Sequence, residues 1–346
     1  MFNLSNKDLD ELSKDFSLHK NTFDNKSFLI TGGTGFIGKW LICALNELVK
    51  KNNFKISITV LTRNKNLFIN DFKNDKNINN INFIESDIRY LNEIKPEKYE
   101  FDYLVLGAND ATYEFTLNTS LLTDTLINGT NILIDKFVSK KTKMILHLSS
   151  GAVYGDISNL KSGVSESSNA NFDISDVGSM YGLAKVLVES TLNNFGYKNN
   201  INITNARCFA FSGPHLPLDK HFAFGNFIRN ALMNEDIIIN GDGSPVRSYL
   251  YPVDLSNFLL RLFTINKPNI TVNVGSSHQI SIKNLAEKIL DVTNLNKKVI
   301  IRNSDVEHPE KSNFYLPNTS YAKSLGLKEN ISIDESILRT FNFYQN

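Results

Sequence analysis

The sequence has few cysteines, few glycines, few prolines and almost no net charge. Its 346 residues contain 2 Cys, 18 Gly and 8 Pro, and 37 Lys and Arg nearly balance 36 Asp and Glu. Two cysteines are too few for a disulfide framework or a four-ligand zinc site. A balanced chain also lacks the long-range positive field that holds a protein on nucleic acid or an acidic membrane surface.

The sequence also has no hydrophobic run of the roughly 20 residues that a membrane-spanning helix needs. Its first residues lack the basic and then apolar pattern of a signal peptide. Cys43 and Cys208 lie in apolar segments, where reduced thiols are expected. We therefore expect a cytoplasmic protein with no nucleic-acid or membrane partner, and no spacing of histidines or cysteines indicates a metal site.

The hydrophobic content, 41% of residues, is sufficient for a folded core, and the length suggests roughly two domains. From residue 27 onward, short runs that are apolar on both faces alternate with helical stretches. The runs span residues 28–30, 56–61, 101–106, 144–148 and 201–206. This alternation predicts a parallel sheet covered by helices on both sides, which is a doubly wound α/β domain of the Rossmann type.

The regular alternation loosens after Gly213 and Pro214. We expect residues 1–25 to form an N-terminal helical extension, opened by a capping pattern at Ser5. We expect residues 26–213 to form the Rossmann-type domain, to which residues 248–275 return. Residues 214–247 and 276–346 are expected to form a smaller, mixed second lobe.

A glycine turn follows the first apolar run. Gly32, Gly35 and Gly38 have the spacing G-x-x-G-x-x-G between a predicted strand and a predicted helix that opens with Phe36 and Ile37. Glycine permits a tight turn and a close approach of the backbone to a pyrophosphate, which then lies at the helix N-terminus. This context favours dinucleotide binding over an ordinary tight turn.

The end of the second apolar run bears on the choice between NAD and NADP. An acid there bonds the ribose 2′-hydroxyl of NAD, whereas an arginine accommodates the phosphate of NADP. The sequence has Thr62 and Arg63 at this place, so NADP binding and a solvated arginine are both open. Asp87 and Ile88 follow a third run and are candidates to border the adenine.

Two further patterns could carry chemistry. Tyr181 and Lys185 are four residues apart on a predicted helix, so they share one face, and an ammonium beside a phenol favours the phenolate. Ser149 and Ser150 end an apolar strand at the sheet edge where such folds bind ligands. Each pattern alone is common by chance. His147, inside the same strand, is interpreted as a core residue.

The ordered set of motifs resembles the extended short-chain dehydrogenase/reductases, in the NAD-dependent epimerase/dehydratase branch that acts on nucleotide sugars. The matching segments are residues 32–38, 149–155, 181–185 and 247–254, within a resemblance that runs from about residue 27 to residue 326. The resemblance implies that Tyr181 is the general base, that Lys185 holds the nicotinamide ribose, and that Ser150 polarises the sugar hydroxyl.

The resemblance also implies binding roles. Gly107 and Ala108 would line the NAD(P) cofactor, and Arg247 would clamp the diphosphate of a nucleoside-diphosphate sugar, a task suited to the bidentate guanidinium group. His221 and Asn226 fall where the family's substrate lobe begins and are candidate sugar or phosphate contacts. A homodimer is expected from the family.

Two departures from the family pattern bear on the reaction. The family's 4,6-dehydratases carry Asp-Glu after the catalytic Ser or Thr, but Gly151 and Ala152 occupy those places here and cannot transfer a proton. Ala210 stands where the family commonly has Asn. We therefore predict an NAD(P)-dependent enzyme that is a 4-epimerase, with a 4,6-dehydratase, a keto-sugar reductase or a non-catalytic NAD(P)-sensing protein as alternatives.

Overall fold

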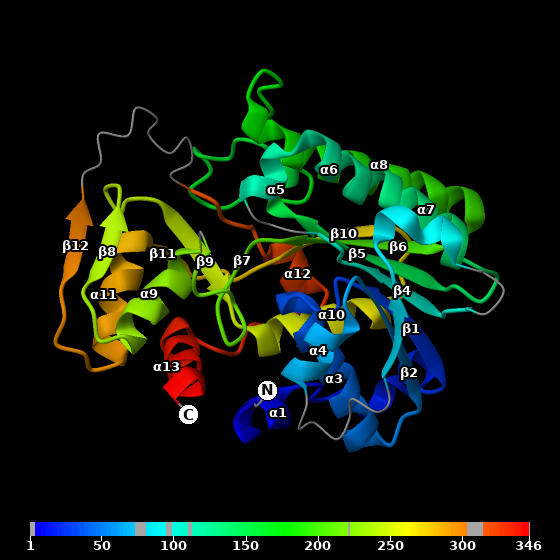
Figure 1. Cartoon of the computed structure of the whole chain (residues 1–346), viewed down its shortest axis with the longest axis horizontal. Helices are drawn as coiled ribbons and strands as arrows, with labels where there is room; N and C mark the ends of the chain where they lie inside the picture. The colour runs from blue at the N-terminus through cyan, green and yellow to red at the C-terminus, as the bar shows by residue number, and fades with distance from the viewer. Residues whose placement is uncertain are drawn as a thin grey trace. The chain divides into compact units, whose positions relative to one another are not determined.

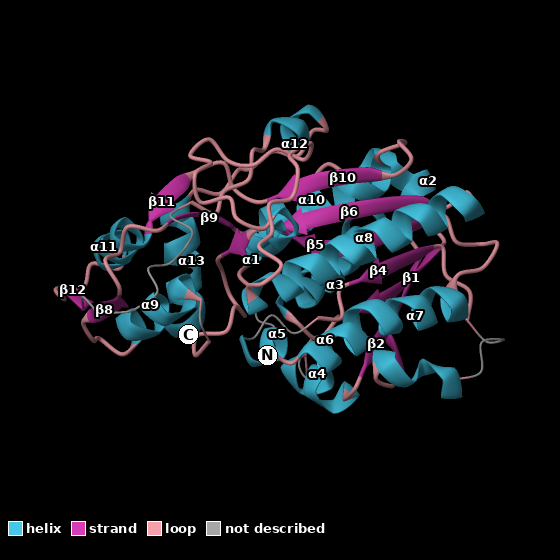
Figure 2. Cartoon of the chain, turned by 90° about the horizontal axis from the view of Figure 1, so that it is seen from above, coloured by secondary structure: helices cyan, strands magenta, loops and turns pink. Residues whose placement is uncertain are grey.

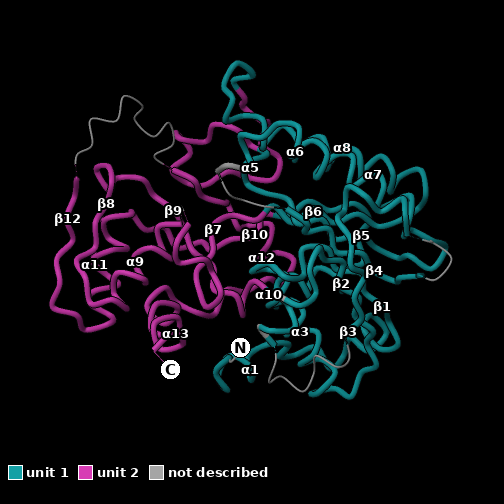
Figure 3. Tube along the Cα trace, viewed as in Figure 1, with its two compact units in different colours: residues 1–153, 173–207, 256–272 teal, residues 154–172, 208–255, 273–346 magenta. Residues whose placement is uncertain are grey.

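The computed structural model describes residues 4–72, 81–94, 99–109, 113–220, 222–302 and 314–345. The chain divides into two compact units, drawn in different colours in Figure 3. Unit 1 comprises residues 1–153, 173–207 and 256–272, and unit 2 comprises residues 154–172, 208–255 and 273–346. Residues 154–172, 208–213, 248–255 and 273–275 group with unit 2. The sequence-based division placed all four segments with the Rossmann-type domain.

A seven-stranded sheet forms the centre of unit 1. The strands are β1 (Lys26–Thr31), β2 (Ile56–Thr62), β3 (Ile81–Glu85), β4 (Tyr103–Leu106), β5 (Met144–Ser150), β6 (Asn202–Cys208) and β10 (Ile270–Val274). Their order is β10-β6-β5-β4-β1-β2-β3, and β1 pairs in parallel with both β2 and β4. The strand order reverses between β1 and β4, which is where such sheets bind ligands. The predicted doubly wound fold is confirmed.

The sheet is covered on both faces, as the apolar runs predict. Phe28, Leu29 and Ile30 are all fully buried, although successive residues of a strand point to opposite faces. Figure 1 shows one group of helices on one face and another on the opposite face. The first group is α5 (Tyr113–Leu117), α6 (Thr119–Thr123), α7 (Gly129–Phe137) and α8 (Met180–Asn199), and the second includes α3 (Phe36–Asn52), α4 (Lys65–Asp71) and α10 (Pro252–Thr264).

The predicted N-terminal helix is present as α1 (Asn6–Glu11), followed by α2 (Lys20–Phe23). The Ser5 hydroxyl accepts a hydrogen bond from the Asp8 N–H and caps the first turn. Lys51, near the end of α3, donates hydrogen bonds to the carbonyl oxygens of Leu9 and Leu12. These bonds satisfy carbonyl groups that the end of a helix otherwise leaves open, so the extension is fastened to unit 1.

Unit 2 contains two small sheets and four helices among its described residues (Figure 2). The sheets have the orders β11-β9-β7 and β12-β8. The strands are β7 (Ala210–Phe211), β8 (Ile237–Asn240), β9 (Val246–Leu250), β11 (Gln279–Ser281) and β12 (Val299–Arg302), and the helices are α9 (Ala223–Leu232), α11 (Ile282–Val292), α12 (Ser320–Ser324) and α13 (Ile333–Gln345). Within the described ranges of both units, no helix combines the length and apolarity needed to cross a membrane.

Candidate functional site

The turn after β1 packs backbone against backbone, so two of its positions accept only glycine. A Cβ at Gly32 would lie 2.2 Å from the carbonyl oxygen of Gly107, and a Cβ at Gly38 would lie 2.3 Å from the carbonyl oxygen of Gly32. Gly32 also has a φ of +69°, which side chains disfavour. The turn therefore lies directly against the end of β4.

Thr31 ties the ends of β1 and β4 together. Its hydroxyl oxygen accepts hydrogen bonds from the N–H groups of Gly107, at 3.0 Å, and Ala108, at 3.1 Å, and it donates to the carbonyl oxygen of Val105 at 3.3 Å. Thr31 is buried. The predicted cofactor residues Gly107 and Ala108 are thus fixed beside Gly32.

Helix α3 begins at this turn without a side-chain cap. Its N-cap residue is Gly35, and Phe36 and Ile37 are half-buried in the first turn. The N–H groups at the start of a helix and the helix dipole together attract an anion. A Cβ at Gly35 would meet only the carbonyl oxygen of Gly32, at 3.3 Å. A bare helix N-terminus with glycine at its cap fits the pyrophosphate of a dinucleotide.

The predicted nucleotide contacts after β2 and β3 are Thr62, Arg63, Asp87 and Ile88. Arg63 is exposed and Thr62 is buried. Asp87 accepts hydrogen bonds from Arg89 Nε at 2.9 Å and Nη2 at 2.8 Å. These bonds, together with the nearby charges of Arg89 and Arg63, hold the pKa of Asp87 below its usual value. Ile88 is buried in the hydrophobic cluster under the helices.

Helix α8 turns a polar stripe toward the sheet. Tyr181, Lys185, Glu189 and Asn193 recur at every fourth position, so they lie on one face. The Lys185 ammonium is only 3% exposed and donates a hydrogen bond to the carbonyl oxygen of Leu148 at 2.9 Å. The structure thereby places the predicted Tyr181 and Lys185 pair beside the end of β5.

A buried ion pair fixes the last residues of β5. Glu189 accepts hydrogen bonds from the Ser149 hydroxyl at 2.5 Å and from Arg207 Nη2 at 2.7 Å. Ser150 is half-buried, and its hydroxyl oxygen accepts a hydrogen bond from the Ala152 N–H at 3.1 Å. Because Ser149 is committed to the ion pair, Ser150 is the serine that can serve a ligand.

His147 is a neutral core residue, as the sequence predicted. Its Nδ1 lies 3.0 Å from Asn205 Oδ1, and Asn205 Nδ2 donates to Asn193 Oδ1 at 3.0 Å. Burial, and secondarily the positive charge of Lys185, lower the pKa of His147 to about 3. This network continues the polar stripe of α8 below Lys185.

The Tyr181 hydroxyl oxygen accepts a hydrogen bond from the side chain of Asn109, with Nδ2 at 2.8 Å. Sequence reasoning did not identify Asn109, Glu189 or Arg207. The repetition of polar residues four apart on α8 was a signal for Glu189. Asn109 and Arg207 had none, because each is joined to its partner across a large separation in the sequence.

Two predicted substrate residues are described in unit 2. Arg247 in β9 lies with its guanidinium carbon 5.9 Å from the centre of the Tyr315 ring and donates to the carbonyl oxygen of Val246 at 3.0 Å. Asn226 in α9 donates its side-chain N–H to the carbonyl oxygen of Lys220 at 2.8 Å. His221, the third, lies outside the described residues.

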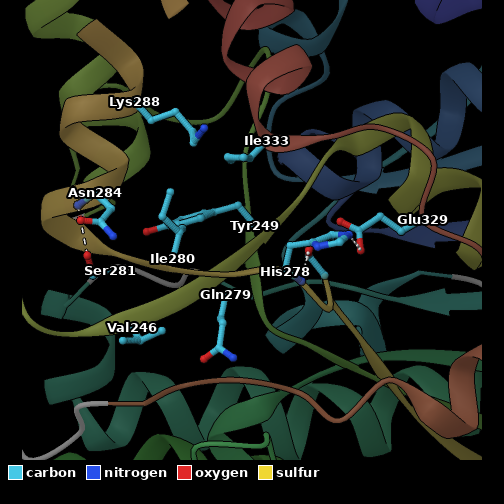
Figure 4. A pocket seen from close by; sticks show the side chains of 11 residues that line it. Val246, Tyr249, His278, Gln279, Ile280, Ser281, Asn284, Lys288, Glu329 and Ile333 are labelled. Atoms are coloured by element: carbon cyan, nitrogen blue, oxygen red, sulfur yellow. Dashed lines mark hydrogen bonds and ion pairs between the residues drawn. The ribbon is translucent and has the colours of Figure 1, made fainter. Parts of the chain in front are cut away.

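Unit 2 also contains an open pocket of about 450 Å³ beside α11 (Figure 4). Tyr249 and Ile280 form apolar walls, and Asn284, Lys288 and Glu329 contribute polar groups. Neither Arg247 nor Asn226 is among the residues that line it. Arg247 nevertheless borders the pocket, because its chain neighbour Val246 and its cross-strand partner Ile280 both line it.

The chain matches known proteins over most of its length. Residues 28–275 match the model of the NAD dependent epimerase/dehydratase family. UDP-glucuronic acid decarboxylase 4 of Arabidopsis thaliana is 26% identical over 86% of this chain, which spans 63% of that protein's length. A putative UDP-glucose 4-epimerase of Methanocaldococcus jannaschii is 28% identical over 92% of this chain and 98% of that protein.

Solved structures share the fold. A UDP-N-acetylglucosamine 4-epimerase from Methanobrevibacter ruminantium M1, solved in complex with UDP-N-acetylmuramic acid, superimposes with a TM-score of 0.78. It is 21% identical, and the match covers 93% of this chain and 99% of that one.

Proposed function

The chain belongs to the NAD dependent epimerase/dehydratase family, and we propose that it modifies a nucleoside-diphosphate sugar through a 4-keto intermediate, by 4-epimerisation. The observation that carries the proposal is the buried Lys185 ammonium, fixed on the same face of α8 as Tyr181. Binding a nucleotide alone does not need a phenol beside a desolvated cation, whereas removing a proton from a sugar hydroxyl does.

The chain's own residues would hold the cofactor in the following way. The pyrophosphate would lie at the start of α3, and Gly107 and Ala108 would line the nicotinamide side of the site. When bound, the cofactor would supply the nicotinamide ring that accepts the hydride from C4 and later returns it. Arg63 would contact the 2′-phosphate of NADP, because two carboxylates described near the end of β2 already have cationic partners: Asp87 pairs with Arg89 and Glu85 with Lys65.

The remaining steps belong to the side chains at the end of β5. Tyr181 would take the proton of the C4 hydroxyl, and the Lys185 charge would stabilise the phenolate that accepts it. Ser150 would donate a hydrogen bond to the same sugar oxygen. The keto sugar would then rotate in the site, and Tyr181 would return the proton to the C4 oxygen as the hydride adds to the other face of C4.

Gly151 and Ala152 weigh against 4,6-dehydration. Elimination of water across C5 and C6 needs an acid and a base, and neither residue can transfer a proton. Decarboxylation is the second candidate, since a decarboxylase is among the relatives. A 4-keto uronic acid is a β-keto acid and can lose CO₂ without a further catalytic base. The enolate that remains would take a proton from water at C5 before the hydride returns to C4, so Tyr181, Lys185 and Ser150 would serve this reaction too.

In unit 2 we propose Arg247 as the diphosphate contact and Asn226 as a contact of the sugar or phosphate. The guanidinium group of Arg247 offers two parallel N–H donors that match phosphate oxygens.

The test is a product analysis with purified protein, NAD or NADP, and UDP-glucose, UDP-N-acetylglucosamine or UDP-glucuronic acid. Epimerisation leaves the mass unchanged and inverts C4 in the NMR spectrum. Loss of water would overturn the epimerase assignment in favour of dehydration, and loss of CO₂ would establish decarboxylation. Tyr181→Phe should lower turnover to a small residual rate, while Tyr197→Phe, on an exposed part of the same helix, should leave turnover unchanged.

A further inference from the structure

Asn109 places a side-chain amide against the oxygen of the proposed base. Its Nδ2 lies 2.8 Å from the Tyr181 hydroxyl oxygen. The residue follows directly on Gly107 and Ala108, whose backbone N–H groups are bonded to Thr31. Asn109 therefore directly follows a backbone segment that Thr31 holds at the end of β1.

The other end of the same amide is buried with nothing to accept from. In the described part of the chain, Oδ1 of Asn109 has no hydrogen-bond partner and is inaccessible to solvent. Buried acceptors without a donor are costly and uncommon in folded proteins. Such an atom next to a proposed active-site tyrosine indicates that a bound ligand supplies the missing donor.

The geometry of the amide restricts which donor fits. Oδ1 and Nδ2 are bonded to one carbon, so Oδ1 lies within two hydrogen-bond lengths of the Tyr181 oxygen. The sugar hydroxyl that gives its proton to Tyr181 must lie one hydrogen-bond length from that oxygen. A hydroxyl on the neighbouring ring carbon is then near enough to reach Oδ1 when sugar binding uncovers that otherwise covered atom. On a hexose oxidised at C4 this neighbour is the 3-hydroxyl.

We propose that Asn109 is a positioning residue for Tyr181 that also reads the sugar: its amide nitrogen holds the phenol oxygen in place, and its buried carbonyl oxygen accepts a hydrogen bond from the 3-hydroxyl. The second half of this inference rests on the proposed function. The bound cofactor offers other donors, namely its carboxamide and ribose hydroxyls, and the experiment below separates these from the sugar.

The sugar contact is tested by calorimetric titration of the full-length, NAD-loaded protein with UDP-glucose, UDP-3-deoxyglucose and UDP. In the wild type, removing the 3-hydroxyl should weaken binding about tenfold, the worth of one hydrogen bond. In Asn109→Leu the two sugars should bind equally, and UDP should bind as it does to the wild type. If Asn109→Leu still binds UDP-glucose about tenfold more tightly than UDP-3-deoxyglucose, the sugar contact is wrong. A loss of affinity for NAD with no change in affinity for either sugar would also overturn it.

The contact with Tyr181 is tested without turnover, by NMR of protein labelled with ¹³Cζ-tyrosine at constant pH. The Tyr181 signal is assigned with Tyr181→Phe. It should shift in Asn109→Leu and in the smaller variant Asn109→Ser, but not in Asn131→Leu, which changes an exposed residue of α7. An unmoved Tyr181 signal overturns the proposal. If the wild type binds no UDP-glucose, the nucleotide-sugar assignment fails while this measurement still decides the role of Asn109.

A kinetic cycle shows whether Asn109 acts through Tyr181. Asn109→Leu should lower kcat about tenfold in the wild-type background. It should leave the residual rate of Tyr181→Phe unchanged, because Tyr181→Phe has already removed the hydrogen bond between the two side chains. Equal losses in both backgrounds would mean that Asn109 supports the site by some other route, and would contradict the positioning role.

Discussion

The ammonium group of Lys185 donates a hydrogen bond to the backbone carbonyl oxygen of Leu148, 2.9 Å away, in a position where the lysine is 3% exposed. A buried charge is tolerated when it is hydrogen-bonded. Leu148 belongs to β5, inside the central sheet. The positive charge that would activate Tyr181 is therefore fixed by the backbone of the sheet.

We predict that Lys185→Met lowers turnover at least about 100-fold, which is the scale of general acid–base catalysis. Methionine has a similar volume, and removing the desolvation cost of a buried charge offsets the loss of the hydrogen bond to Leu148. The thermal unfolding midpoint should therefore change little. Lys198→Met, at the exposed end of the same helix, is the matched control. Full activity in Lys185→Met would remove the basis of the proposed mechanism.

Gly35→Ala and Gly38→Ala should separate folding from cofactor binding. A Cβ at Gly38 would clash with the Gly32 carbonyl oxygen, so we expect Gly38→Ala to lower the free energy of unfolding by about 2 kcal/mol or more. Gly35 has a φ of −81° and ψ of 176°, which alanine adopts easily. Gly35→Ala should fold normally but bind NAD more weakly. Urea unfolding and NAD titration measure the two effects, and equal stability losses would argue against this division.

Arg63→Leu should weaken NADP binding by roughly 10- to 100-fold and leave NAD binding nearly unchanged. The range corresponds to the loss of one charge-assisted hydrogen bond to the 2′-phosphate. Arg302→Leu, at an exposed arginine of unit 2, controls for the general loss of positive charge. The assignment fails if Arg63→Leu leaves the NADP dissociation constant where it is in the wild type.

His147 should make the fold sensitive to acid. Its pKa is about 3 in the folded protein against an ordinary value of 6.5, so between these values the unfolded chain binds a proton that the folded chain does not. The free energy of unfolding should therefore fall as the pH drops from about 6.5 toward 3, by up to about 1.4 kcal/mol per pH unit. Urea unfolding at several pH values should show a shallower fall in His147→Gln. Identical slopes for His147→Gln and the wild type would refute the prediction.

The sheet of unit 1 could be predicted from the sequence because its strands are buried on both faces. Phe28, Leu29 and Ile30 form an unbroken apolar run because both faces of β1 are covered, so all three side chains are buried. The end of β5 was harder, since the apolar run stops at Leu148 while the strand continues to Ser150. The small sheets of unit 2 had no periodic signal, because a strand such as β11, Gln279–Ser281, is too short to show one.

The candidate site was predictable only where residues are close in sequence or follow a strand end. The Tyr181 and Lys185 spacing and the glycine turn are local patterns of this kind. The bond between Ser149 and Glu189 joins residues 40 apart, and that between Asn109 and Tyr181 joins residues 72 apart. Only the folded chain brings such pairs together, and no periodicity of the sequence reports them.

The polar stripe of α8 has a consequence for how this part of the fold opens. Most helices can detach from a sheet by exposing apolar side chains, but α8 would have to break the Glu189 ion pair and expose the Lys185 charge at the same moment. A partly detached α8 would leave buried ionic groups without their partners. This state is therefore less stable than one in which α8 has separated from the sheet completely. In hydrogen exchange, the amide protons of α8, β5 and β6 should accordingly be released together, as one cooperative unit.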